Sequence, residues 1–189
     1  MNIVQVGCHD GNDHVFEFIS SNFENISKAY LIEPLHENYL KAVEKYKQFK
    51  FVEVIEAAIV DDENLSTIEI FYPENIDQSQ TTSIYKNHAE KHQDKVLSKN
   101  VNCFTLSSLF KNKEIKTIDR LYIDAEGLDC KIINSINFSE FDIKYIEYEY
   151  THSDGTDTFG KFGESIENKL NNLGFKIRKN PPFNKIAEK

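Results

Sequence analysis

Apolar residues recur along the chain with two alternating periods. The stretch NIVQV at 2–6 is a short apolar run typical of a buried strand, and the stretch at 13–23 repeats its apolar residues at helical spacing. Further strands are predicted at 28–33, 51–60, 66–72, 118–124, 143–150 and 175–179, further helices at 36–49, 128–136 and 162–174, and a strand that runs into a short helix at 101–110. Strands that alternate with helices predict βαβ units, and therefore an α/β domain with a mostly parallel sheet.

Two of these segments also predict how their side chains are oriented. In the helix predicted at 36–49, four residues recur at helical spacing and define its buried face: Tyr39, Leu40, Val43 and Tyr46. In the strand predicted at 143–150, Glu147 and Glu149 share one face. That face either carries functional carboxylates or is solvated, as on an edge strand.

The region 73–99 is polar and only partly periodic. We expect it to be a partly helical surface excursion over one end of the sheet, within a single domain that spans 1–189. Its lysines and histidines between Lys86 and Lys95 form a basic island among acidic neighbours. In one interpretation, this island steers an anionic acceptor toward the acceptor site, and the excursion helps to cover that site. In the other, it is a solvated helix.

Two histidines of the excursion, His88 and His92, lie four residues apart and could share a helix face. The metal-binding pattern H-E-x-x-H is not met, because Ala89 follows His88, and no third ligand is obvious. We therefore predict a solvated helix here and no metal site.

Composition narrows the classes of function. The chain has 31 acidic residues against 22 basic ones and a net charge of −9, which argues against a sequence-independent grip on nucleic acid, so no nucleic-acid partner is expected. No apolar run approaches the roughly 18 residues of a membrane span, and the start MNIVQV does not resemble a signal peptide. The three cysteines form no C-x-x-C pair. Sparse, unpaired cysteines fit a reduced, cytoplasmic setting.

A glycine-containing polar loop follows the first predicted strand. In an open α/β sheet, ligands bind beyond the carboxyl ends of the strands, and the loop with Gly7 and Gly11 lies at such an end. A dinucleotide site would use G-x-G-x-x-G, whereas this loop reads G-x-x-x-G with Cys-His-Asp between the glycines. This wider loop suits a ligand with an amino acid moiety. Glu33 ends the second predicted strand, where a carboxylate can accept hydrogen bonds from ribose hydroxyls.

These segments resemble the FkbM type of class I S-adenosylmethionine-dependent methyltransferase. The resemblance rests on six stretches in the order of the family's motifs: VQVGCHDG, YLIEPLHENYLKAVEKY, EAAIVDDE, VNCFTLSSLF, IDRLYIDAEGLDCKIINSI and YIEYEY. It implies a Rossmann-like, doubly wound, mostly parallel sheet with an antiparallel C-terminal strand. The chain departs from the family pattern at His9, where Asn is usual, and at Tyr122 and Asp129, where Lys and Glu are common.

The resemblance also implies roles for individual residues, with S-adenosyl-L-methionine as the cofactor. Gly7, Cys8, His9 and Gly11 would surround its methionine part, Glu33 would bind the ribose, and Ala57 and Ala58 would line the adenine. Gln5 and Pro34 complete the expected cofactor-binding set. The expected acceptor is a hydroxyl of a sugar, glycan or small molecule; the oligomeric state is left open.

The expected catalytic groups are Asp124, Glu126, Glu149 and His152. The sequence DAEG follows an apolar strand, so Asp124 and Glu126 emerge at the ligand edge of the sheet, where a general base would assist a hydroxyl acceptor. Other interpretations stay open. Glu126 could be a charge at a helix N-terminus, and His152 could be an ordinary loop histidine.

Three alternative functions are weighed. The sequence NPPF at 180–183 resembles a motif of amino-methyltransferases, but it follows the expected last strand, so an ordinary chain exit is favoured. A nicotinamide oxidoreductase is disfavoured by the missing third glycine. A non-catalytic module that binds S-adenosylmethionine remains a further alternative.

Overall fold

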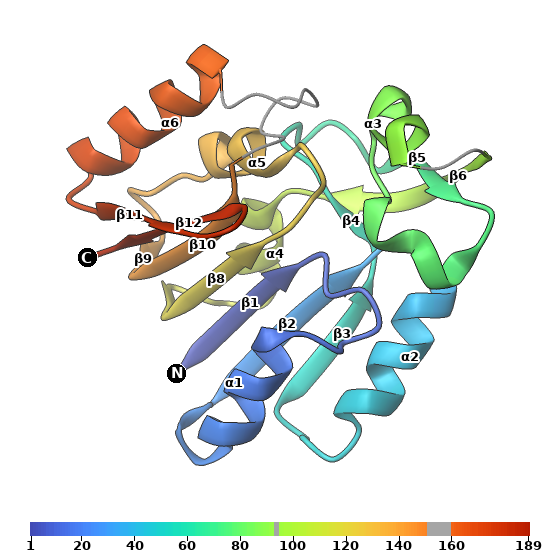
Figure 1. Cartoon of the computed structure of the whole chain (residues 1–189). Coiled ribbons are helices and arrows are strands. Elements are labelled where there is room, and N and C mark those ends of the chain that lie inside the picture. The colour runs from blue at the N-terminus through green and yellow to red at the C-terminus, as the bar shows by residue number, and fades with distance from the viewer. Residues whose placement is uncertain (93–94, 151–159) are drawn as a thin grey trace.

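The computed structural model describes residues 1–92, 95–150 and 160–189. A seven-stranded sheet with the order β11-β12-β10-β8-β1-β2-β3 forms its centre (Figure 1). The neighbouring strands from β10 to β3 run parallel, whereas β12 is antiparallel to both β10 and β11. The expected α/β sheet, mostly parallel with an antiparallel C-terminal strand, is confirmed.

The elements have the following bounds. The strands of the central sheet are β1 Asn2–Val6, β2 Lys28–Glu33, β3 Val52–Glu56, β8 Arg120–Ile123, β10 Tyr145–Glu149, β11 Lys176–Asn180 and β12 Asn184–Glu188. The other strands are β4 Ala58–Ile59, β5 Thr67–Pro73, β6 Val96–Phe104, β7 Thr117–Ile118 and β9 Asp142–Ile143. The helices are α1 His14–Asn22, α2 His36–Tyr46, α3 Lys86–His92, α4 Leu106–Asn112, α5 Asp129–Ser135 and α6 Gly160–Asn172, with 3₁₀ turns at Phe23–Asn25 and Ile76–Thr81.

The alternating side chains of the central strands build two apolar cores. On one face, Ile3 of β1 packs with Val15 and Ile19 of α1 and with Ala42 of α2. On the other face, the side chains of β1, β8 and β10 pack with α4, α5 and α6, and Figure 1 shows α5 and α6 on the opposite side of the sheet from α1 and α2. Burial on both faces explains why the central strands read as apolar runs.

The excursion is built on a hairpin of the second sheet, which has the order β4-β6-β5. β5 and β6 pair antiparallel, with Thr67 opposite Asn102 and Pro73 opposite Val96. The 3₁₀ turn Ile76–Thr81 and helix α3 lie between these two strands in the chain. Figure 1 shows this part beside the end of the central sheet at which the strands β1 and β2 terminate.

Two expectations about the elements were wrong. Leu40 and Val43 of α2 are 51% and 39% exposed; Tyr46 of the predicted face is buried, together with Asn38 and Ala42, which were not expected. The chain does not end its sheet with β11, because β12 follows and inserts between β11 and β10. NPPF is therefore the connection of a hairpin and not a chain exit.

Among the described residues, no helix is both long and apolar enough to cross a membrane.

Candidate functional site

A cavity of about 350 Å³ lies at the carboxyl ends of the parallel strands. Four segments of the sequence that carry predicted residues line it: the loop after β1, the end of β2, the β3–β4 junction and the loop after β8. The excursion contributes a further wall with Ser79, Gln80, Thr82, Ser83 and Ile84. The strand order places β1 between β8 and β2, so the glycine loop lies between Asp124 and Glu33.

The two glycines of the loop are required by the backbone geometry. Gly7 has φ +74°, and a Cβ atom there would lie 1.9 Å from the carbonyl oxygen of Asp124. Gly11 has φ +75°, and its Cβ would lie 2.8 Å from the ring of Tyr46. Left-handed backbone and close packing both exclude a side chain at these positions. The loop can thus pass tightly between the ends of β8 and β2.

Glu33 is a buried carboxylate at the end of β2, only 4% exposed. Its Oε2 accepts a hydrogen bond from the backbone N–H of His9 at 3.0 Å, and its Oε1 accepts one from the N–H of Leu35 at 2.9 Å. Burial raises the pKa of Glu33 to about 7, although these hydrogen bonds and the charge of Lys99 act in the opposite direction. A buried carboxylate with further acceptor capacity suits hydroxyl donors of a ligand.

The excursion contacts this end of the cavity through Ser79, which is 2% exposed. The Ser79 Oγ accepts a hydrogen bond from Asn38 Nδ2 at 2.8 Å and lies 3.0 Å from His9 Nε2. Its own hydroxyl donates to the carbonyl oxygen of Ile76. The excursion therefore forms part of the cavity at the Glu33 end, whereas the sequence predicts that it helps to cover the acceptor site.

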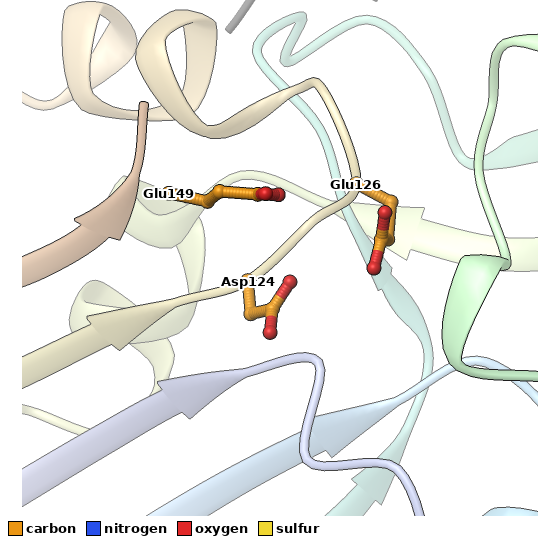
Figure 2. Close-up of side chains that lie close together, drawn as sticks. All are labelled: Asp124, Glu126 and Glu149. Atoms are coloured by element: carbon orange, nitrogen blue, oxygen red, sulfur yellow. The ribbon is translucent and has the colours of Figure 1, made fainter. Parts of the chain in front are cut away.

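The carboxylates of Asp124 and Glu126 line the other end of the cavity, and that of Glu149 lies close to them. One oxygen each of Asp124, Glu126 and Glu149 lie within 4.8 Å of one another. Figure 2 shows Asp124 at the end of β8, Glu126 on the following loop and Glu149 at the end of β10, with the three side chains directed toward a common space. Desolvation, together with the charges of Glu126 and Glu149, raises the pKa of Asp124 well above its ordinary value. Such a group favours a cation or a donated proton nearby.

Glu126 is held by the excursion. Its backbone has φ +46°, and its carbonyl oxygen accepts a hydrogen bond from Ser83 Oγ at 2.7 Å. Its carboxylate Oε2 lies 2.8 Å from Nε2 of His88, a side chain with no solvent exposure. The interpretation of His88 as part of a solvated helix was wrong, because the ring is buried against this carboxylate.

Asp129, the first residue of α5, is buried and lies next to the acidic cluster. Its two carboxylate oxygens accept hydrogen bonds from the backbone N–H groups of Ala125 and Glu149. Burial and the charges of Asp124 and Glu149 raise its pKa well above the ordinary value. Asp129 thereby joins the loop after β8 to the end of β10.

The interpretation of Glu147 and Glu149 as solvated edge positions was also wrong. β10 is an interior strand, and the two residues are 5% and 9% exposed. Glu147 accepts hydrogen bonds from the Tyr145 hydroxyl at 2.7 Å and from the Asn180 amide at 2.9 Å. Burial acts to raise the pKa of Glu147, but the contact with His14 and the hydrogen bonds from Tyr145 and Asn184 outweigh it and lower the pKa to about 2. It belongs to a structural network apart from the cavity.

The structure brings together most of the residues predicted for the site. Those that line the cavity are Gly7, Cys8, His9, Glu33, Pro34, Ala57, Ala58, Asp124 and Glu126. Gln5, Gly11 and Glu149 are not among the lining residues. Gln5 Nε2 instead donates to Asp13 Oδ2 at 2.6 Å, and Glu149 lies beside Asp124 and Glu126. His152 lies outside the described residues.

Sequence reasoning missed several residues of the site. Asp13 lines the cavity and caps α1, where its Oδ1 accepts hydrogen bonds from the N–H groups of Val15 and Phe16. The pattern of an Asp just before the apolar helical residues is a known N-cap signal and could have identified it. Ser79 and His88 carried no comparable signal.

Comparison with known proteins gives the following matches. The model of the methyltransferase FkbM domain matches residues 5–177. No curated protein matches the chain at a significant level.

Similar solved structures share the fold. The methyltransferase FkbM from Methylobacillus flagellatus KT has a TM-score of 0.56 at 10% identity, covering 100% of this chain and 43% of that one. The fibrillarin pre-rRNA processing protein of Methanococcus jannaschii has a TM-score of 0.53 at 13% identity, covering 99% of this chain and 65% of that one. SMU.1697c from Streptococcus mutans, solved in complex with SAH, has a TM-score of 0.51 at 13% identity, covering 99% of this chain and 87% of that one. This chain thus spans less than two thirds of the first two structures, and the matches confirm the predicted Rossmann-like fold.

Proposed function

The chain belongs to the FkbM methyltransferase family, and from that membership we propose that it transfers a methyl group from S-adenosylmethionine to a hydroxyl of a sugar, glycan or small molecule. Methyltransferase activity and S-adenosylmethionine as the cofactor follow from the family. The hydroxyl acceptor and the roles of individual residues are the finer parts of the proposal. The observation that carries them is that the buried carboxylate Glu33 lines one end of the cavity and the carboxylates Asp124 and Glu126, with Glu149 beside them, line the other end.

The cavity fits this cofactor in size and charge. Its volume of about 350 Å³ falls within the range of small-molecule sites. Glu33 and Asp124 end strands that flank β1, so about 10 Å of sheet width separates those strands. The glycine loop lies between these strand ends, and its residues Gly7, Cys8 and His9 line the cavity. In this placement the ribose lies at Glu33, and the positively charged sulfonium lies toward Asp124 and Glu126.

The chain's own groups then position the acceptor and receive its proton. When bound, S-adenosylmethionine supplies an electrophilic methyl group on a sulfonium. Asp124 would receive the proton that the acceptor hydroxyl loses on methylation. A carboxylate with a raised pKa is the better base for a hydroxyl, and alignment of the reacting atoms within about 3–3.5 Å contributes much of the rate.

The proposal is tested in two stages. Calorimetry with S-adenosylmethionine, SAH and NAD should give binding of the first two and none of NAD. Transfer of a labelled methyl group is then screened over sugars, glycans and small hydroxyl compounds, with RNA and amine-containing peptides as the competing acceptor classes. Methylation confined to RNA or to amines would overturn the proposed acceptor and leave the family assignment intact.

Asp124→Asn separates a base from a cofactor-binding group. We expect turnover to fall by roughly 10²–10⁴, as for loss of a general base, with SAH affinity little changed. Asp119→Asn is the matched control. Asp119 directly precedes the first residue of β8, at the end of the strand opposite to Asp124, and pairs with Lys144 at the surface. A large loss of SAH affinity at preserved turnover would make Asp124 a binding residue, and Glu126 or Glu149 would become the candidate base.

A further inference from the structure

Ser79 is the point at which the excursion meets the groups around Glu33. The serine is 2% exposed and Asn38 is fully buried, so their hydrogen bonds are shielded from water. Ser79 belongs to the 3₁₀ turn Ile76–Thr81, whereas Asn38 lies on α2 and His9 in the glycine loop. Three separate segments of the chain therefore converge on one hydroxyl.

The hydrogen atoms of this contact can be assigned from the network. The Ser79 hydroxyl has one proton, which it donates to the carbonyl oxygen of Ile76. Its two lone pairs accept from Asn38 Nδ2 and from His9 Nε2. His9 must therefore carry a proton on Nε2, while its Nδ1 faces the carboxylate of Asp10 at 3.4 Å. The capacity of the Ser79 hydroxyl is fully used.

Both partners of Ser79 also act on Glu33. The backbone N–H of His9 donates to Glu33 Oε2, and the Asn38 side chain hydrogen-bonds the same carboxylate and lowers its pKa. Without the serine hydroxyl, the buried Asn38 amide and the His9 ring each lose a partner. The Asn38 amide and the His9 ring would then be free to reorient, and the Glu33 carboxylate would be held less firmly, by the backbone N–H groups of His9 and Leu35.

We propose that Ser79 is a positioning residue for the cofactor, which acts through His9 and Asn38 to aim Glu33 at the ribose hydroxyls. The inference rests on the proposed cofactor site and adds a residue from the excursion to it. The excursion then contributes to recognition of the cofactor as well as covering the cavity.

The test compares two ligands that differ in one ribose hydroxyl: SAH and its 2′-deoxyribose analogue. The wild-type protein should prefer SAH by about tenfold, as expected for a hydrogen bond to a charged group. In Ser79→Ala this preference should shrink about three- to tenfold, because Glu33 no longer faces the hydroxyl. Gln78→Ala is the matched control, since Gln78 lies in the same turn and is exposed.

The ratio of the two affinities distinguishes positioning from general damage. If Ser79 had only a structural role, Ser79→Ala would weaken the binding of both ligands equally. An unchanged preference for SAH in Ser79→Ala would therefore overturn the inference and leave the proposed function intact. If Ser79→Ala does not fold, Ser79→Cys keeps the volume with a much weaker hydrogen-bonding group and should show the same loss of preference. A wild-type protein that binds no SAH would instead refute the cofactor site itself, and the role of Ser79 with it.

Discussion

Cofactor affinity should depend on pH through Glu33. This carboxylate is 4% exposed, and burial raises its pKa to about 7. The groups that oppose this rise are the backbone N–H donors of Leu35 and His9, the Asn38 amide and the charge of Lys99. Since the ribose hydroxyls donate hydrogen bonds, they favour the ionised carboxylate. Protonation of Glu33 should therefore weaken binding as the pH falls through 7.

The size of the effect follows from the ionised fraction. With a pKa of about 7, roughly nine-tenths of Glu33 is ionised at pH 8 and roughly one-tenth at pH 6. SAH affinity should thus fall about tenfold between these values. The stability of the ligand-free protein should change in the opposite direction and increase as the pH falls. A carboxyl whose folded pKa lies above its unfolded value of 4.5 destabilises the fold above pH 7, by about 3 kcal/mol for this shift, and the cost is relieved as the pH falls to 4.5.

Calorimetry with SAH from pH 6 to pH 8 measures this dependence. Glu33→Gln should bind about 1–3 kcal/mol more weakly at pH 8 and should lose most of the slope, since Gln keeps the shape without a titrating proton. Asp124→Asn serves as the control, because Asp124 also has a raised pKa and should not cause the slope. A flat profile for the wild-type protein, or a slope that persists in Glu33→Gln, would refute the reasoning.

Two further predictions concern the loop and the excursion. Gly7→Ala should destabilise the protein by more than about 2 kcal/mol and abolish SAH binding, because it adds a clash with Asp124 to a left-handed backbone. Gly174→Ala, also at positive φ but with open space around the residue, should cost only about 1–2 kcal/mol. Thermal and denaturant unfolding measure both variants, and equal losses of stability would show that the clash with Asp124 does not contribute. His88→Phe should lower turnover on the acceptor found by the screen, while SAH affinity stays nearly constant. His88→Gln should recover part of the rate, because its amide can donate a hydrogen bond to Glu126. Full activity in His88→Phe would show that Glu126 needs no hydrogen bond from residue 88.

The fold and the centre of the site could be predicted because their signals are local. The period of apolar residues identifies strands and helices within windows of a few residues, and parallel strands place their carboxyl ends at one edge. Gly7 and Glu33 were recognisable for the same reason, since each directly follows or ends an apolar strand. The hairpin strand β12 was missed because two prolines precede it and its apolar residues, Ile186 and Ala187, are adjacent and do not alternate.

The excursion could not be predicted in this way, because its role depends on polar contacts between distant parts of the chain. His88 lies between lysines and resembles a solvated helix position, whereas its buried ring contacts Glu126, 38 residues further on. Ser79 meets His9 across 70 residues. A buried polar side chain requires a partner, and a sequence pattern shows the polar residue without showing where the partner lies.

The excursion holds a glutamate at each end of the cavity, and the two contacts differ in kind. Toward Glu33 it acts through intermediates, His9 and Asn38, whereas it touches Glu126 directly through Ser83 and His88. A substitution in the excursion near Ser79 should therefore alter cofactor recognition, and one near His88 should alter the reaction with the acceptor. The pairing of β1 with β2 and β8 fixes where the glycine loop begins, whereas His9 within the loop contacts Ser79. The part of the excursion around His88 is therefore where acceptor preference can change while the cofactor loop keeps its geometry.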